Sequence, residues 1–219
     1  MKLYSAPVSM YGAKVEIAVI EKQIDLEVEF VPFSMKTIYE PKPDLTWQSN
    51  PKGEVPYLID DDLTLFDSTL LFEFLEDLSP DIPLWPGDAR QRAIARLWEC
   101  KSDEVFFPQV TQFMPKRRAN ASEEDLQAAS TAIRNFYGEL DRTVADREFL
   151  VFDFSYADIA CYTSQFFAGF LGEGPNAKEF PALAKWKHRM KQRDSVRTVL
   201  GKMALFLRTY NMHVPDLLD

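Results

Sequence analysis

Hydrophobic and polar positions near the N-terminus alternate between two periodicities. Residues 1–4 form a short, mainly apolar run, and residues 26–31 alternate apolar side chains with glutamates. Alternation with a period of two is typical of a half-buried strand. Between these runs, apolar residues recur at helical spacing, which predicts a helix over roughly residues 11–22. The chain is therefore predicted to begin with a strand–helix–strand unit.

A second group of elements follows an irregular stretch. Residues 33–50 contain two closely spaced prolines, so any helix there is short. Residues 55–59 and 63–66 are apolar runs on either side of three aspartates, which predicts a hairpin, and residues 68–78 form an amphipathic helical pattern. The strand–helix–strand unit predicts that the first two strands are parallel and joined by a right-handed crossover. The hairpin adds antiparallel strands to the same sheet, so residues 1–78 are predicted to form an α/β domain of order βαβ-ββα.

A cluster of helix-breaking residues separates this domain from the rest of the chain. Residues 79–88 contain three prolines and a glycine, which predicts a linker. Helical periodicity then continues almost to the C-terminus, so residues 89–219 are predicted to form an all-α domain. Ser155 and Asp158 have the spacing of a capping box at the start of the third helix of this domain. The predicted helices cover residues 89–114, 123–145, 156–171, 181–193 and 195–207.

The composition narrows the classes of partner. The 219 residues carry a formal net charge of −9, which weighs against binding to the phosphate backbone of a nucleic acid. No run approaches the ~20 apolar residues that cross a bilayer, so no membrane partner is expected. The N-terminal run predicts a strand rather than a signal peptide. Both cysteines lie in helical patterns, as expected of reduced thiols. We therefore expect a cytoplasmic protein.

Two segments of the predicted first domain contain a serine and a proline at defined positions relative to their neighbours. Residues 4–15 (Tyr-Ser-Ala-Pro-Val-Ser-Met-Tyr-Gly-Ala-Lys-Val) put Ser9 five positions before a basic residue. Residues 50–58 (Asn-Pro-Lys-Gly-Glu-Val-Pro-Tyr-Leu) put the Val55-Pro56 bond at the start of a predicted strand. An X-Pro bond can adopt the cis form at low cost, unlike other peptide bonds.

Two further segments complete the pattern. Residues 66–69 (Phe-Asp-Ser-Thr) put Asp67 and Ser68 at the start of a predicted helix, whose free N–H groups attract a carboxylate. Residues 180–196 contain Phe-Pro-Ala-Leu-Ala-Lys-Trp followed by Arg-Asp-Ser-Val. In this order and at these distances, the four segments resemble the cytosolic glutathione transferase family over nearly the whole chain. The serine at position 9 resembles the zeta and tau classes, or a related bacterial class with serine there.

The resemblance implies a thioredoxin-like domain that binds glutathione, followed by an all-helical domain that contributes the electrophile site. In the family the serine holds the glutathione sulfur, and Ser9 has that position here. A cis bond between Val55 and Pro56 leaves the backbone of Val55 free to pair with glutathione. Asp67 is placed to face the ammonium of the γ-glutamyl end, and Ser68 to face its carboxylate. Glutathione is therefore expected as a cosubstrate, without a metal.

The electrophile site is less well defined by the resemblance. Met10 stands where a proline often follows the serine, and the arginine common three positions further on is absent. Met10, Tyr11 and Phe106 are candidates for lining a site for a small apolar electrophile. The resemblance leaves open whether Lys36 or Lys42 meets the glycyl carboxylate of glutathione.

Three hypotheses on function remain open. The first is conjugation of glutathione to an apolar electrophile, and the second is another glutathione-dependent reaction, such as isomerisation, ether cleavage or dehalogenation. The third is a non-catalytic module for protein contacts. His188 and His213 are too far apart in the sequence to predict a metal site or a Ser-His-Asp triad. Serine rather than cysteine at position 9 disfavours thiol–disulfide exchange, and analogy with the family suggests a homodimer.

Overall fold

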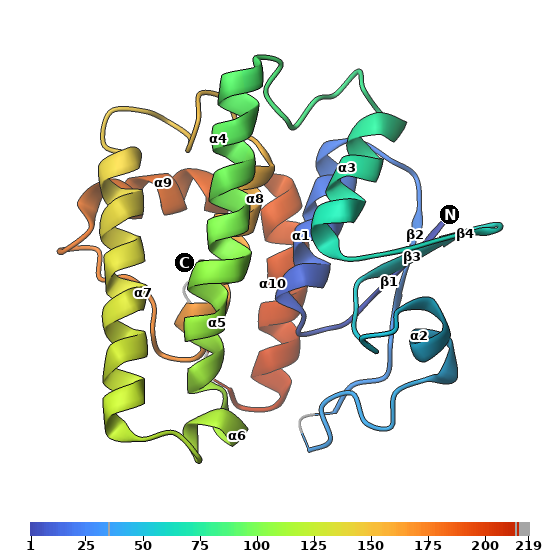
Figure 1. Cartoon of the computed structure of the whole chain (residues 1–219), viewed down its shortest axis with the longest axis horizontal. Coiled ribbons are helices and arrows are strands. Elements are labelled where there is room, and N and C mark those ends of the chain that lie inside the picture. The colour runs from blue at the N-terminus through green and yellow to red at the C-terminus, as the bar shows by residue number, and fades with distance from the viewer. Residues whose placement is uncertain (35, 213, 215–219) are drawn as a thin grey trace. The chain divides into compact units, whose positions relative to one another are not determined.

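The computed structural model describes residues 1–34, 36–212 and 214 of the chain (Figure 1). The chain divides into two compact units. The first comprises Met1–Leu84 and Asp194–Asn211, and the second is built on Trp85–Arg193. Each unit has its own secondary structure: a sheet with helices in the first, and helices alone among the described residues of the second.

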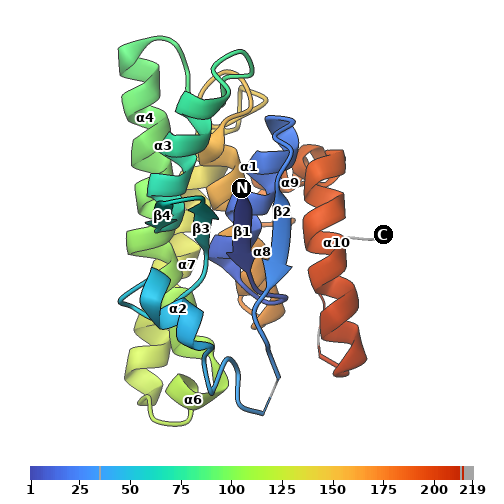
Figure 2. The same cartoon turned by 90° about the vertical axis from the view of Figure 1, so that its right-hand side faces the viewer.

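The first unit contains a four-stranded mixed sheet of order β2-β1-β3-β4, visible in Figure 2. The strands are β1 (Lys2–Ser5), β2 (Glu27–Phe30), β3 (Tyr57–Asp60) and β4 (Leu63–Phe66). Strands β1 and β2 are parallel, whereas β3 is antiparallel to both β1 and β4. The predicted parallel pair and the predicted hairpin in the same sheet are therefore confirmed.

The register of the sheet fixes where its loops emerge. Tyr4 of β1 pairs with Tyr57 of β3, and Tyr57 also pairs with Phe66 of β4. Tyr4 and Phe66 lie near the ends of their strands, while Tyr57 begins its own. The loop after β1, the loop before β3 and the loop after β4 therefore leave the same end of the sheet.

The described residues of the first unit form four helices: α1 (Met10–Glu21), α2 (Asp44–Ser49), α3 (Ser68–Leu78) and α10 (Asp194–Thr209). Helix α1 links the two parallel strands, and it contacts both α3 and α10. Nine of its twelve residues are buried, as expected of a helix that is covered on several sides. Although α10 follows all the helices of the second unit in the sequence, its contacts place it against α1.

The second unit is helical. Its central helix is α8, which has thirteen of its fifteen residues buried and contacts α4, α5 and α9. None of the helices that the structure describes is long and apolar enough to cross a membrane. The helical segments are α4 (Ala89–Cys100), the π-helix η1 (Lys101–Phe106), α5 (Phe107–Val110), the 3₁₀ turn η2 (Thr111–Phe113), α6 (Pro115–Arg118), α7 (Glu123–Thr143), α8 (Tyr156–Phe170) and α9 (Pro181–Lys191).

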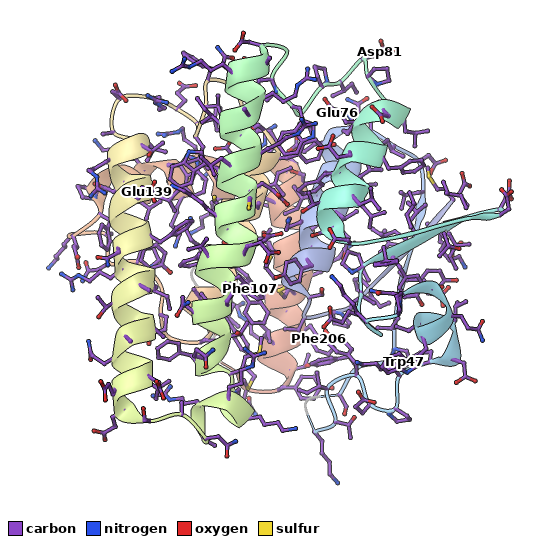
Figure 3. The ribbon with its side chains drawn as sticks, viewed as in Figure 1. Trp47, Glu76, Asp81, Phe107, Glu139 and Phe206 are labelled. Atoms are coloured by element: carbon purple, nitrogen blue, oxygen red, sulfur yellow. The ribbon has the colours of Figure 1, made fainter. Side chains whose placement is uncertain are left out.

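The helix predicted over residues 89–114 is interrupted. The π-helical turn η1 separates α4 from α5, in which Phe107 is labelled in Figure 3. Pro108 has no N–H and its ring crowds the preceding turn, so regular i→i−4 bonding cannot continue through this point. The wider turn is held by Ser102, whose Oγ donates to the carbonyl oxygen of Ala160 at 3.0 Å and to Oγ of Ser164 at 2.9 Å.

The predicted capping box at the start of α8 is confirmed. The N–H and Oγ of Ser155 both donate to Oδ2 of Asp158, each at 3.1 Å. The other carboxylate oxygen accepts from the N–H of Leu150 at 3.0 Å and from Nε1 of Trp186 at 2.8 Å. Burial raises the pKa of Asp158 to about 6, while these hydrogen bonds lower it. One carboxylate thus ties together the loop before α8, the start of α8, and α9.

Candidate functional site

Ser9 begins helix α1. It is the N-cap residue, and its Oγ accepts from the N–H of Gly12 at 2.9 Å, which satisfies one of the free donors of the first turn. The side chain is 9% exposed. Among the described residues, no acceptor is present for the proton of its own hydroxyl. Ser9 therefore offers an unused O–H donor beside the positive end of a helix dipole.

The first turn of α1 packs very closely on the end of β1. A Cβ atom at Gly12 would lie 2.2 Å from Oγ of Ser5 and 3.2 Å from Oγ of Ser9, so only glycine fits there. Ser5 in turn donates to Oε1 of Glu16 at 2.5 Å. Burial raises the pKa of Glu16 to about 7, although Ser5 and the charge of Lys202 on α10 lower it. This buried carboxyl group was not predicted from the sequence, because it lies within an otherwise apolar helical run.

The Val55-Pro56 bond is cis, as expected from the sequence. Among the described residues, neither the N–H nor the carbonyl oxygen of Val55 has a hydrogen-bond partner. The loop before it is held by Asn50, whose Nδ2 donates to the carbonyl oxygen of Glu54 at 2.8 Å and whose Oδ1 accepts from the N–H of Lys52 at 2.9 Å. Val55 therefore presents one donor and one acceptor of the backbone from a well-supported loop.

Gly53 and Trp47 shape the same loop. Gly53 has a φ of +63°, and a Cβ atom there would lie 2.5 Å from the ring of Trp47, which projects from α2 and is labelled in Figure 3. Nζ of Lys42 lies 4.9 Å from the centroid of that ring and 3.6 Å from the carboxylate of Glu40. Whether Lys42 or Lys36 meets the glycyl carboxylate of glutathione stays a prediction.

The start of helix α3 carries the predicted pair Asp67 and Ser68. Asp67 has a φ of +83°, which is unusual for a residue with a side chain and is often found at functional sites. Its Oδ1 accepts from the N–H of Thr69 at 3.0 Å, and its Oδ2 lies 3.7 Å from Nζ of Lys52. Ser68 is buried in the first turn, where helix N–H groups without intrahelical partners gather.

A buried lysine lies beneath this helix start. Lys14 has no exposed surface, its Nζ donates to Oγ of Ser68 at 3.3 Å, and it lies 4.9 Å from the ring centroid of Phe72. The hydroxyl of Ser68 has no acceptor for its own proton among the described residues. Of the electrophile-site candidates, Tyr11 is half-buried with its ring centroid 5.8 Å from the Lys14 ammonium, and Met10 is buried. The sequence shows a basic residue at this spacing but predicts no role for it.

Phe106, the third electrophile-site candidate, lies in the second unit. It is 2% exposed and stacks on Phe136 with ring centroids 4.5 Å apart. The ring centroid of Tyr137 lies 5.5 Å away on the same cluster. The ring of Phe106 is thus enclosed by the core of its own unit. Within the described residues, no group of three or more His, Cys, Asp or Glu side chains is arranged to hold a metal ion.

The loops that carry Ser9, Val55 and Asp67 all leave the same end of the sheet, as the strand register requires. The contact of Lys14 with Ser68 adds a direct link between α1 and α3. This end of the unit therefore combines two hydroxyl donors, one backbone donor–acceptor pair and a helix N-terminus. Such a set suits an extended, peptide-like ligand that carries a carboxylate.

Comparison with protein families gives matches in both units. The N-terminal domain of glutathione S-transferases matches residues 3–83, and the C-terminal domain of glutathione S-transferases matches residues 97–194. Together these two domains account for most of the chain, in the order that the family has.

Individual relatives span nearly the full length. Protein LigF of Sphingobium sp. is 25% identical over 92% of this chain and 93% of its own. The crystal structure of LigF, described as a beta-etherase, covers 92% of this chain and 98% of that one with a TM-score of 0.78. A stringent starvation protein A homolog of Coxiella burnetii is 26% identical over 95% of each chain.

A solved glutathione complex is also similar. The structure of a sphingomonad glutathione S-transferase with bound glutathione is 25% identical, covers 94% of this chain and 100% of that one, and has a TM-score of 0.77. The thioredoxin-like arrangement of the first unit and the helical second unit agree with these structures. By its two matched domains and its structural relatives, the chain belongs to the glutathione transferase family.

Proposed function

We propose that this chain is a glutathione transferase, which activates the thiol of glutathione for attack on a small apolar electrophile. The observation that carries the proposal is the set of unsatisfied groups at one end of the sheet. The hydroxyl protons of Ser9 and Ser68 and both backbone groups of Val55 lack partners among the described residues. Buried or half-buried polar groups are seldom left unpaired, so a ligand with matching donors and acceptors is expected.

Ser9 is proposed to stabilise the thiolate of bound glutathione. A thiol with a pKa of about 8.5 is only roughly 3% ionised at neutral pH, and lowering that pKa by about two units requires ~2.7 kcal/mol of preferential binding to the anion. A hydroxyl donor to a charged sulfur supplies ~1.5–3 kcal/mol, and a helix N-terminus adds ~0.3–1 kcal/mol. Ser9 combines both, because its oxygen is held by Gly12 while its proton is free to point at the sulfur.

The remaining groups are proposed to bind the ends of glutathione. Val55 pairs with the peptide backbone of the ligand, in one rung of strand addition beside Pro56. Ser68 and the first turn of α3 receive the γ-glutamyl carboxylate, with the Lys14 ammonium behind the hydroxyl. Asp67 faces the γ-glutamyl ammonium.

A second candidate is ether cleavage by the same site, in which the glutathione thiolate displaces an ether oxygen. The similarity to LigF, whose structure is described as a beta-etherase, favours this reaction among the alternatives. A third candidate is a non-catalytic interaction module, since the name of the Coxiella burnetii relative states no enzymatic activity. We further propose that the protein is cytoplasmic and forms a homodimer, and light scattering of the purified protein can test the oligomeric state.

Calorimetry with glutathione tests the proposal directly. Wild type is expected to bind, and Ser68→Ala is expected to bind more weakly because the carboxylate loses a donor. Ser122→Ala is the matched control: Ser122 also caps a helix, but it lies in the second unit and should leave glutathione affinity unchanged. Absence of binding to wild type would refute both enzymatic candidates and favour the interaction module.

The thiolate absorbance of bound glutathione tests the role of Ser9. The thiol pKa is expected to rise by about a unit or more in Ser9→Ala, because a hydrogen bond to the charged sulfur is lost. An unchanged pKa in a variant that still binds glutathione would exclude Ser9 as the activating residue. A product screen with apolar ethers and other electrophiles then distinguishes conjugation from ether cleavage.

A further inference from the structure

A groove lies in the second unit, between the short helical segments that follow η1 and the first turns of α7. Figure 1 shows these segments at the lower end of the unit, with α6 below α5 and beside the start of α7. The volume of the groove is about 800 Å³, within the roughly 300–1,000 Å³ of pockets that hold drug-sized ligands. The residues that line it all belong to this unit, so the groove needs no contribution from the first unit.

The lining of the groove is polar. Its apolar members are alanines, and none of the described residues that line it is aromatic or a large aliphatic residue. Ligand pockets are usually lined mainly by hydrophobic and aromatic side chains, so this groove suits a polar ligand instead. The lining residues that carry an amide are Gln109, Gln112 and Asn120.

Several of these polar groups have hydrogen-bonding capacity to spare. Gln109 is half-buried, and its amide makes no hydrogen bond to the described residues. Asn120 donates from Nδ2 to the carbonyl oxygen of Lys116 at 2.7 Å, which leaves its Oδ1 available as an acceptor. In Asp125, Oδ2 accepts from Ser122, while Oδ1 has no partner among the described residues. The groove thus offers donors and acceptors together, which suits hydroxyl groups because each hydroxyl both donates and accepts.

The groove also contains positive charge that no carboxylate neutralises. Within the part of the chain that the structure describes, the ammonium of Lys116 forms no ion pair or hydrogen bond. Arg117 donates one of its five N–H groups, from Nη1, to Oγ1 of Thr111 at 2.7 Å, and that hydroxyl donates to the carbonyl oxygen of Pro108 at 2.8 Å. These bonds to neutral groups hold the guanidinium while its charge and its other N–H groups stay available. Asp125 is the one acidic residue of the described lining, and it forms no ion pair with either cation.

We propose that this groove binds a phosphorylated sugar. The phosphate lies against the ammonium of Lys116 and the guanidinium of Arg117, because charge-assisted hydrogen bonds to phosphate are the strong ones. The sugar hydroxyls pair with the amides of Gln109 and Asn120 and with Oδ1 of Asp125. The volume leaves room for about one or two sugar rings.

Calorimetric titration of the full chain with glucose 6-phosphate and with trehalose 6-phosphate tests the proposal. Saturating S-hexylglutathione is present throughout, so that the proposed glutathione and electrophile sites are filled. At least one of the two sugar phosphates is expected to bind about tenfold more tightly than inorganic phosphate and than the same sugar without phosphate, because each of these lacks one part of the interaction.

Three results of this titration would overturn the proposal. The first is no binding of either sugar phosphate. The second is equal affinity for inorganic phosphate, which would show a site for an adventitious ion only. The third is equal affinity for the free sugar, which would show that the positive charges contribute nothing.

Variants assign the binding to this groove. Lys116→Gln removes an exposed charge that has no partner among the described residues, so it should fold normally and bind the sugar phosphate about tenfold more weakly. Gln109→Met keeps the length of the side chain, removes the amide, and should weaken binding about threefold or more. Arg118→Gln is the matched control, because Arg118 lies on the same short helix as Lys116 but does not line the groove. Unchanged affinity in Lys116→Gln or Gln109→Met, or an equal loss in Arg118→Gln, would refute the assignment.

Discussion

The buried carboxyl group of Glu16 should make the stability of the protein depend on pH. Its pKa is raised from an ordinary value of 4.5 to about 7, and burial is the largest cause. The side chain is 8% exposed. Because the folded state holds the proton more tightly than the unfolded state, the protonated group stabilises the fold fully below about pH 4.5. That stabilisation is lost as the pH rises to about 7 and remains absent above it.

The size of this change in the free energy of unfolding follows from the shift in the pKa of Glu16. A rise from 4.5 to about 7 corresponds to about 3 kcal/mol between the two ends of the pH range, with other groups held constant. Glu16→Gln replaces the carboxyl group by a neutral amide of the same shape, which still accepts from Oγ of Ser5. The variant should therefore match wild type in acid and exceed its free energy of unfolding by about 2–3 kcal/mol in mild alkali.

Urea unfolding of both proteins at about pH 5 and about pH 8 measures this difference. At each pH, the free energy of unfolding of wild type is subtracted from that of Glu16→Gln. The change in this difference between the two pH values is the relevant quantity, because the titration of all other groups cancels. Glu124→Gln, at an exposed position of α7, is the matched control and should show no such change. A difference in the free energy of unfolding between Glu16→Gln and wild type that is the same at both pH values would refute the reasoning. It would mean that Glu16 neither gains nor loses a proton when the protein unfolds.

Three further substitutions probe the packing and the proposed site. Gly12→Ala places a Cβ atom 2.2 Å from Oγ of Ser5, so thermal unfolding should show a loss of about 1–3 kcal/mol; a gain in stability would contradict the close approach. Asp158→Ala leaves four buried donors without an acceptor and should cost on the order of 4 kcal/mol in urea unfolding, whereas a loss below about 1 kcal/mol would contradict the proposed network. Lys14→Met removes the cation that donates to Ser68, so calorimetry should show glutathione affinity reduced about tenfold; unchanged affinity in the folded variant would exclude this role.

Most of the fold could be predicted because local patterns and tertiary packing agree. The alternation of Leu26, Val28 and Phe30 with glutamates predicts a half-buried strand; the structure contains the strand β2 at Glu27–Phe30, but all four of its residues are exposed. The capping box of Ser155 and Asp158 fixes the start of α8 from sequence alone because its hydrogen bonds are local. The interruption of the helix at η1 was not predicted, because one proline near the end of a long periodic run does not show how the preceding turns adjust.

The candidate site could be predicted only in part, because some of its features depend on tertiary packing and not on local sequence. Ser9 and Ser68 stand out by their position in a family pattern, and helix N-termini are recognisable from sequence. Lys14 and Glu16 do not stand out, since a charged residue in a helix is usually exposed and a periodic pattern cannot show that its face is covered. Their burial depends on α3 and α10, which lie far away in the sequence and are in contact with α1.

The return of α10 to α1 makes the first unit discontinuous along the chain. The hydrogen bond from Ser195 to Glu21 joins residues 174 positions apart, and the rings of Phe33 and Phe206 lie 5.5 Å apart (Figure 3 labels Phe206). During synthesis, residues 1–84 emerge before α10, so the helix that covers one side of α1 is missing until the second unit's residues 85–193 have been made. Nascent chains of this protein therefore expose an incomplete first unit while residues 85–193 are being synthesised, a period in which chaperone binding would protect it from aggregation.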